Sequence, residues 1–134
     1  MAFWILKTEP STYSFGDLQK AKRAVWDGVA NPVALRNLRA MAIGDEAMIY
    51  HTGDEKAVVG LARVVRAAYA DPKQDDPRLV VVDLEAGKPV PAPVTLKAIK
   101  ADPAFADLAL VRQGRLSVVP VPAALWTRLL DMGA

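Results

Sequence analysis

Short strand-like stretches alternate with short helix-like stretches along the whole chain, and this order limits the fold more than any other feature. An apolar run over residues 3–6 predicts a buried strand. Residues 14–17 have the form of a capping box, which predicts a short helix through about residue 22. From residue 45 onward the pattern is mainly that of strands. Strands with helices inserted between them favour an α+β domain built around a small, open β-barrel surrounded by short helices.

A second helix is expected between Asn31 and Gly44. Asn31 is typical of an N-cap, Pro32 of the first helical turn, and Gly44 of the position after a helix end. The other expected elements are strands over residues 47–50, 57–67, 79–84 and 116–121, helices starting near 95 and 102, a closing helix over 123–130, and a loop over 26–28.

Two features should disturb the strands of the second half. Gly60 lies inside the long strand expected over residues 57–67 and predicts a bulge there. Prolines at 89, 91 and 93 cannot donate a backbone hydrogen bond. They predict that regular strand pairing is interrupted until Val94.

Composition places the chain among ordinary globular proteins. Its 134 residues, 52% hydrophobic and 24% charged, are expected to form one domain over residues 1–134. No apolar run approaches the roughly 20 residues that span a bilayer, and the first residues do not resemble a signal peptide. No membrane partner is therefore expected. Cysteine is absent, which fits a cytoplasmic location and excludes disulfides and thiolate metal sites.

The charged residues limit the classes of function. The net charge of +2 permits contact with a polyanion but does not by itself predict one. The only histidine is His51, so a serine nucleophile would have to recruit that residue as its base. No carboxylate cluster has the spacing of metal ligands. We therefore expect no metal and no cofactor, and catalysis is not favoured. The sequence does not determine the oligomeric state, although a monomer is favoured.

Two blocks that combine tryptophan with polar residues point to ligand binding. Residues 4–11 and 26–31 each place a tryptophan beside groups that form directed hydrogen bonds. A flat apolar surface beside a carboxylate, an amide and a hydroxyl suits a planar ligand with polar edges, such as a nucleobase. Trp4 is expected to lie in the core. Trp26 is expected to form one wall of a slot, with Asp27 on the adjacent loop, although packing alone would also explain both tryptophans.

Polar residues also follow two strands where those strands end. Lys7, Thr8 and Glu9 follow the first strand, and Tyr50 and His51 end another. These residues are predicted to form the rim of a pocket. The alternative is a solvated strand end with a weak surface ion pair.

Asn31 and several basic residues have both a structural and a binding interpretation. Asn31 is a good N-cap, and the helix start that it caps can also offer free N–H groups to a ligand. The predicted contacts to nucleic-acid phosphates are the exposed arginines Arg36, Arg39, Arg112 and Arg115, with Ser117 beside the last two. A solvated surface explains isolated arginines equally well.

Several motifs in one fixed order give the chain a family resemblance. They comprise Trp4–Ser11, Tyr13-Ser14, Trp26–Val29 with Asn31, Asn37–Met41, Gly44-Asp45, Tyr50-His51, Val59-Gly60, Tyr69–Pro72, Leu110–Gln113 and Arg115–Val118. With these motifs the chain resembles the EVE domain family, the thymocyte nuclear protein-like group of the PUA-like superfamily, from Trp4 to about Leu130.

The resemblance implies a β-barrel with a pocket for a modified nucleobase. EVE domains are similar to YTH domains, which hold a methylated adenine in an aromatic cage, and are themselves linked to modified cytosine in DNA. Carried over, Trp26, Asp27, Asn31 and residues 7–9 would line the pocket. The residues implied at or near its rim are Tyr50, His51, Arg112, Arg115 and Ser117.

The chain departs from the family pattern at three places. Ala30 stands where arginine is usual, and Pro32–Arg36 replaces the usual Tyr-Gln-Ala-Arg-Asn. Gly114 and Val119 stand where serine and glutamine are common. These departures imply a pocket with an altered wall.

Three functions are compatible with these observations. The first is a non-catalytic reader of a modified base in DNA or RNA, with modified cytosine favoured. The second is a general RNA-binding module, and the third is a small amidohydrolase that acts on modified nucleosides, as in ASCH-type relatives. We rank them in that order. One buried methyl group contributes only about 0.8 kcal/mol, so stronger selectivity would need polar contacts to the base.

Overall fold

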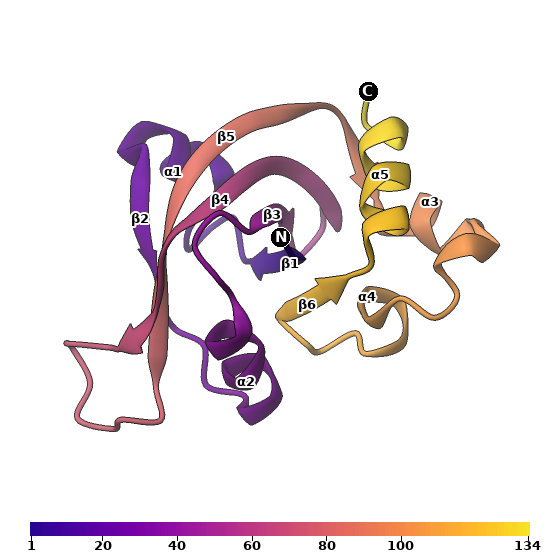
Figure 1. Ribbon diagram of the computed structural model, residues 1–134. Helices are drawn as coiled ribbons and strands as arrows, with labels where there is room; N and C mark the ends of the chain where they lie inside the picture. Colours follow the sequence, from indigo (N-terminus) through magenta and orange to yellow (C-terminus); the bar gives the residue numbers. More distant parts are fainter.

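One curved sheet of six strands organises the computed structural model, which describes residues 1–134 (Figure 1). The strand order is β2-β5-β4-β3-β1-β6, so β2 and β6 form the two edges. The strands are β1 Phe3–Thr8, β2 Arg23–Trp26, β3 Glu46–His51, β4 Ala57–Ala70, β5 Val80–Thr95 and β6 Val118–Val121. The α+β class predicted from the sequence is confirmed. The sequence also predicted a small, open barrel. The structure has a curved open sheet, because the two edge strands do not pair with each other.

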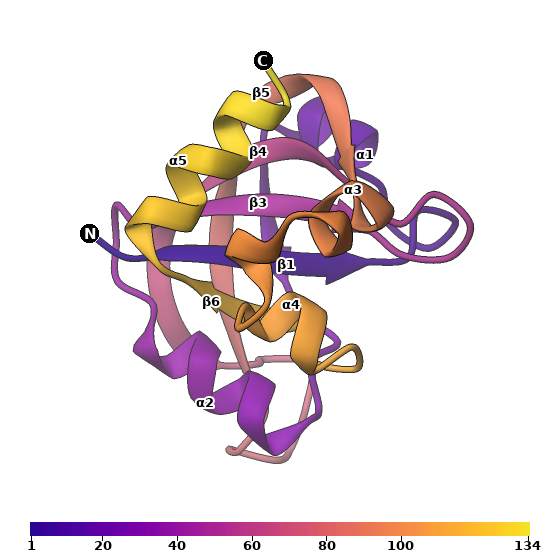
Figure 2. The ribbon, with the colours of Figure 1, turned by 90° about the vertical axis from the view of Figure 1, so that its right-hand side faces the viewer.

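Short helices lie around this sheet. They are α1 Phe15–Ala21, α2 Pro32–Ala40, α3 Leu96–Ala101, the 3₁₀ helix η1 Pro103–Phe105, α4 Ala109–Arg112 and α5 Ala123–Met132. Helices α3, α4 and α5 cover the same face of the sheet, in front of β1, β3 and β4 in Figure 2. None of the helices is long and apolar enough to cross a membrane.

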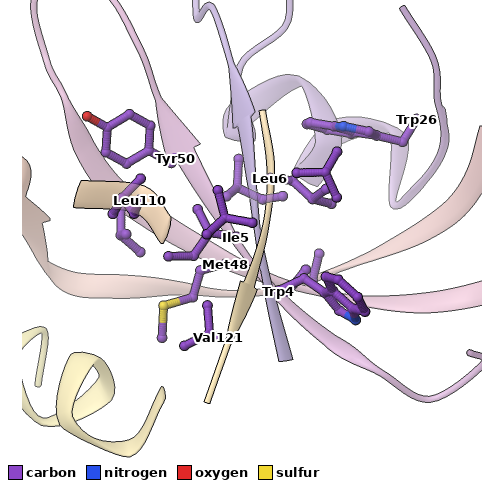
Figure 3. Close-up of a cluster of buried hydrophobic side chains, with 14 of the residues drawn as sticks. Trp4, Ile5, Leu6, Trp26, Met48, Tyr50, Leu110 and Val121 are labelled. Atoms are coloured by element: carbon purple, nitrogen blue, oxygen red, sulfur yellow. The ribbon is translucent and has the colours of Figure 1, made fainter. Parts of the chain in front are cut away.

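The first strand lies at the centre of the hydrophobic core. Strand β1 pairs in parallel with β3 and antiparallel with β6. Ile5 and Leu6 are completely buried among the side chains of a single cluster, close to Met48 (Figure 3). Trp4 is also buried, as the sequence predicted.

Side-chain caps start the helices where the sequence predicted them. The Ser14 hydroxyl accepts a hydrogen bond from the Asp17 N–H, and the Asp17 carboxylate accepts one from the Ser14 N–H. Asn31 Oδ1 accepts from the N–H groups of Val33 and Ala34, at 2.9 and 3.1 Å. These bonds satisfy N–H groups that a helix start otherwise leaves unpaired.

The sequence prediction for the three prolines is wrong, because β5 runs through all of them. Pro89 lies opposite Gly60 of β4, with shifts of register around that pair. Beyond Glu85, β5 no longer pairs with β2, so its remaining length is an edge in which proline is tolerated. The predicted bulge at Gly60 is confirmed, and a Cβ atom there would collide with the Phe15 ring.

Two further elements differ from the sequence prediction. Trp26 ends strand β2, opposite Val82, where a loop was predicted. That strand has only four residues and gives too short a pattern to identify. Helix α4, also of four residues, was missed for the same reason.

Asp45 fixes the start of the sheet. The residue is only 3% exposed, and its carboxylate accepts hydrogen bonds from the Trp4 indole N–H at 3.1 Å and from the backbone N–H groups of Ala2 and Ala42 at 3.0 and 2.9 Å. Burial raises the pKa of this carboxyl, but the three hydrogen bonds outweigh it and hold the pKa below its usual range. The charged form of Asp45 thus stabilises the fold.

Replacing Asp45 should destabilise the protein. In Asp45→Ala, three donors lose their acceptor, so we expect a loss of about 2–4 kcal/mol in the free energy of unfolding. The pKa of Asp45 is lower in the folded protein than in the unfolded chain. Its contribution to the free energy of unfolding is therefore fully present above the unfolded pKa of about 3.9, and it is lost as the pH falls through the pKa of the folded protein. Urea unfolding at pH 7 and at pH 3 measures both effects. Asp75→Ala is the matched control, because Asp75 is exposed and forms no side-chain hydrogen bond or ion pair. Equal stability of the two variants would contradict the role of Asp45.

Candidate functional site

An open cavity of about 540 Å³ lies where β1 ends, beside β2 and the loop that follows it. It has the size of a small-molecule pocket, for which roughly 300–1,000 Å³ is typical. Six residues that the sequence predicted to bind a ligand line it: Lys7, Thr8, Glu9, Trp26, Asp27 and Ser117. We call it the Trp26 cavity.

Strand pairing brings these distant residues together. The Lys7 N–H donates to the Ser117 carbonyl at 2.9 Å, which places the start of β6 beside the end of β1. The Thr52 N–H donates to the Thr8 carbonyl at 2.9 Å, which continues the parallel pairing beyond β3. The polar residues therefore meet at one end of the central strands.

Tyr13 and Trp26 form the aromatic part of the cavity. Their ring centroids are 6.2 Å apart and the ring planes meet at 81°, an edge-to-face arrangement. Trp26 is only 7% exposed, yet its indole N–H is not fully buried and has no partner in the protein. Trp26 thus lines the cavity, and its indole N–H is not used by the protein. Burial raises the pKa of the Tyr13 hydroxyl, as do the charges of Asp17 and Asp27, so this hydroxyl also stays protonated.

The two charged residues at the end of β1 have different environments. Lys7 is half-buried and pairs with no carboxylate; its Nζ donates to the Gly114 carbonyl at 2.8 Å. Burial lowers the pKa of Lys7. Glu9 accepts from the Ser11 N–H and hydroxyl and from the Thr52 hydroxyl. The Ser11 N–H is the largest cause of its lowered pKa. Glu9 is therefore occupied by the protein, whereas Lys7 keeps unused donors.

Of three other polar groups in the cavity lining, one is hydrogen-bonded within the protein and two have no partner. The Thr8 hydroxyl donates to the Tyr13 carbonyl at 2.6 Å and so holds residues 9–13 against the strand. Asp27 is exposed and its carboxylate has no side-chain partner, and the Ser117 hydroxyl has none either. Asp27 and Ser117 are thus available to a ligand.

Three predicted ligand-binding residues lie outside the lining of this cavity. Asn31 caps α2 and borders a separate hollow of about 280 Å³ that Arg115 also lines. Tyr50 borders a smaller cavity, which shares Lys7 with the Trp26 cavity. His51 Nε2 accepts the Phe15 N–H at 2.9 Å, so the ring proton lies on Nδ1, 2.7 Å from Glu55 Oε1. Both ring nitrogens of His51 therefore have partners. Contact of Asn31, Tyr50 or His51 with a ligand stays a prediction.

The four arginines predicted to contact phosphates are all exposed. Arg112 pairs with Asp107 at 2.8 Å, and Arg39 donates to the Arg78 carbonyl at 2.7 Å. Arg36 and Arg115 form no ion pair. Their contact with nucleic acid remains a prediction.

Half of the residues that line the cavity were not predicted from the sequence. The missed residues are Thr12, Tyr13, Ala24, Val25, Gly28 and Val29. Tyr13 had a detectable signal, since it is an aromatic residue in a polar segment just after Pro10 and was part of the family motifs. Ala24 and Val25 had none, because they line the cavity only through the pairing of the short strand β2 with β5.

Comparison with known proteins identifies close relatives. The model of the EVE domain family matches residues 2–132. Thymocyte nuclear protein 1 of Mus musculus is 34% identical over 109 residues, which cover 62% of this chain and 48% of that protein. The chain thus spans about half the length of the curated relatives it matches.

Solved structures repeat the fold over the whole chain. Rpa0253 from Rhodopseudomonas palustris is 42% identical, with a TM-score of 0.92, over 99% of this chain and 93% of that one. Human THYN1, crystallised in complex with 5-methylcytosine containing DNA, is 26% identical, with a TM-score of 0.91, over 99% and 98%. An ASCH protein from Zymomonas mobilis is 12% identical, with a TM-score of 0.60, over 97% and 94%, a likeness that shows the fold alone.

The bond from Thr8 to Tyr13 should determine how firmly the Trp26 cavity is built. In Thr8→Val the shape is kept, but the Tyr13 carbonyl loses its donor, so we expect a loss of about 1 kcal/mol in stability. Amide hydrogen exchange at Thr12 and Tyr13, whose N–H groups bond the Glu9 carbonyl, should become faster. Thr127→Val is the matched control, because the Thr127 hydroxyl bonds only within α5. Unchanged exchange in Thr8→Val would contradict this role.

Proposed function

We propose, from the premise that this chain belongs to the EVE domain family, that it binds a modified cytosine of DNA in the Trp26 cavity, without turnover. One observation carries the proposal. Six residues predicted to bind a ligand line a single cavity, in a fold that matches human THYN1 crystallised with 5-methylcytosine containing DNA. The chemistry of the lining is compatible with such a base.

The free groups of the cavity complement the edge of cytosine. Cytosine carries an amino donor and two acceptors on its pairing edge. The exposed Asp27 carboxylate suits the amino group, and the donors of Lys7, Ser117 or the Trp26 indole suit the acceptors. A methyl group at C5 would find apolar neighbours among Ala24, Val25 and Val29.

The ring geometry limits how a base can stack. Because the planes of Tyr13 and Trp26 meet at 81°, a base parallel to one ring meets the other edge-on. A base therefore stacks on one face only, which contributes about 1–3 kcal/mol. Flipping a base out of a duplex costs a few kcal/mol, so stacking and the polar contacts together must offset that cost.

Catalysis finds little support in the same residues. His51, the only histidine, lies outside the cavity lining and has both ring nitrogens hydrogen-bonded. The Thr8 hydroxyl donates its proton to a backbone carbonyl, so no base in the cavity activates it. Binding is thus the simpler use of the cavity.

The preference for the modified base should be measurable but modest. Duplexes with one central cytosine, 5-methylcytosine or 5-hydroxymethylcytosine, and RNA of the same sequence, are titrated at one salt concentration. Burial of one methyl group predicts about fourfold tighter binding of 5-methylcytosine than of cytosine. Trp26→Phe should weaken binding of all the duplexes because it reduces the stacking surface, whereas Trp126→Phe should not, since Trp126 is a buried tryptophan stacked on Phe3 in another part of the molecule.

Two outcomes would reject the proposal that this chain is a non-catalytic reader of a modified base. Equal affinity for all duplexes, with steep salt dependence and stronger binding of RNA, would favour the general RNA-binding module. Release of product from a modified nucleoside during the same incubation would favour the amidohydrolase.

Asp27 tests the polar contact separately. Asp27→Ala should weaken binding of the 5-methylcytosine duplex by about tenfold or more, because a hydrogen bond to a charged acceptor is lost. Asp54→Ala is the control, since Asp54 is exposed and lies outside the cavity lining. Circular dichroism should be unchanged in both variants, and equal affinities for the duplex would exclude a contact from Asp27.

A further inference from the structure

A second, smaller cavity of about 180 Å³ shares Lys7 with the Trp26 cavity. It lies among the ends of β1 and β3, the turn that follows β3, and helices α3 and α4. One water molecule takes up about 30 Å³ in the liquid, so this volume corresponds to only a few water molecules. It suits a small ion or a single chemical group and not a whole nucleoside. We call it the lysine cavity.

Positive charge dominates the lining of the lysine cavity. Lys7, Lys56 and Lys100 contribute to it from three different elements, and no carboxylate does. None of these lysines forms an ion pair, although six ion pairs involve arginine or histidine elsewhere in the chain. Outside the lining, the Glu9 carboxylate lies against Gly53 and adds one negative charge. The three ammonium groups outnumber it, so the cavity keeps a net positive charge.

A neutral donor in the cavity, the Tyr50 hydroxyl, suits the same kind of ligand. The Tyr50 ring is buried, with only 3% of the residue exposed, yet its hydroxyl has no partner and is not fully buried. Figure 3 shows this oxygen pointing away from the core cluster. Burial raises the pKa of Tyr50, so the hydroxyl keeps the proton that it can donate. Lys7 Nζ lies 5.7 Å from the centroid of the Tyr50 ring.

The backbone holds the turn that carries Lys56 in a defined position. Lys56 has a φ of 46°, in the left-handed region that residues other than glycine seldom adopt. Its carbonyl accepts the Leu96 N–H at 2.8 Å, which ties the turn to the first residue of α3. Lys100 lies on the same helix, so this bond keeps Lys56 and Lys100 at one cavity.

We propose that the lysine cavity binds a phosphate group of the DNA strand whose modified base enters the Trp26 cavity. The inference rests on the proposed function, because a strand that occupies the Trp26 cavity reaches Lys7, which both cavities share. Lysine ammonium groups and a protonated tyrosine hydroxyl are donors that a phosphate accepts. Contact with the backbone at this point adds affinity and orientation but no preference for one base.

The test is a salt titration of lysine variants. Lys56→Gln, Lys100→Gln and the double variant are compared with wild type on duplexes that contain cytosine or 5-methylcytosine, by fluorescence anisotropy. The double variant should bind both duplexes more weakly, and the slope of log affinity against log salt should fall by about one. The ratio of affinities for the two duplexes should stay as in wild type. Lys73→Gln and Lys88→Gln make the same change of charge at exposed residues outside both cavities and should leave the slope unchanged.

A second titration uses inorganic phosphate alone, followed by amide chemical shifts. Phosphate should shift the amides of Lys56 and Gly114 in wild type but not in the double variant, whose remaining spectrum reports that it is folded. Absence of these shifts in wild type, or a slope in the double variant equal to that of the controls, would overturn the proposal. Phosphate-dependent shifts with unchanged DNA binding would also overturn it, in favour of a site for free anions. If wild type shows no preference for 5-methylcytosine but the lysine variants still weaken binding and lower the salt slope, the proposed function is rejected and the phosphate site is not.

Discussion

The parallel pairing of β1 with β3 is the constraint on which the rest of the structure depends. The other neighbouring strands of the sheet are antiparallel, so only this pair places two strand ends that follow buried apolar residues side by side. Polar residues meet there because both strands reach the edge of the core at the same level. Lys7 thereby borders two cavities, one with an aromatic lining and one with a basic lining.

Rigid hydrogen bonds support this end of the sheet from both sides. His51, at the end of β3, accepts the first N–H of α1 and so fixes the start of the helix that leads to β2 and Trp26. The Thr8 hydroxyl, at the end of β1, holds the Tyr13 carbonyl. The two aromatic rings of the Trp26 cavity are thus positioned from neighbouring strand ends. His51 and Thr8, which the sequence suggested as ligand contacts, thus hold segments that carry the cavity lining.

Local signals in the sequence predicted the parts of the fold that local interactions determine. The caps at Ser14 and Asn31 are confirmed, because each needs only the next three residues, and the burial of Trp4 follows from the apolar run around it. Membership of the EVE domain family, expected from ordered motifs, is confirmed as well. Strand β5 was predicted wrongly at its prolines, because only the sheet order shows that this stretch has a single neighbouring strand. Ala24 and Val25 of the Trp26 cavity were missed for the same reason, since they line it through the pairing of β2 with β5, a strand far along the chain.

The open sheet has a consequence for how this chain meets other chains. A sheet that does not close leaves two edges at which another strand can add by backbone pairing. At β6 the Asn37 amide donates to the Val118 carbonyl at 2.7 Å, and Pro120 has no N–H to offer. At the other edge, β2 is only four residues long and begins with the exposed Arg23, which pairs with Asp83. Both edge strands therefore present little free backbone, and three prolines remove N–H groups from the part of β5 beyond β2, which protects the sheet against association through its strands.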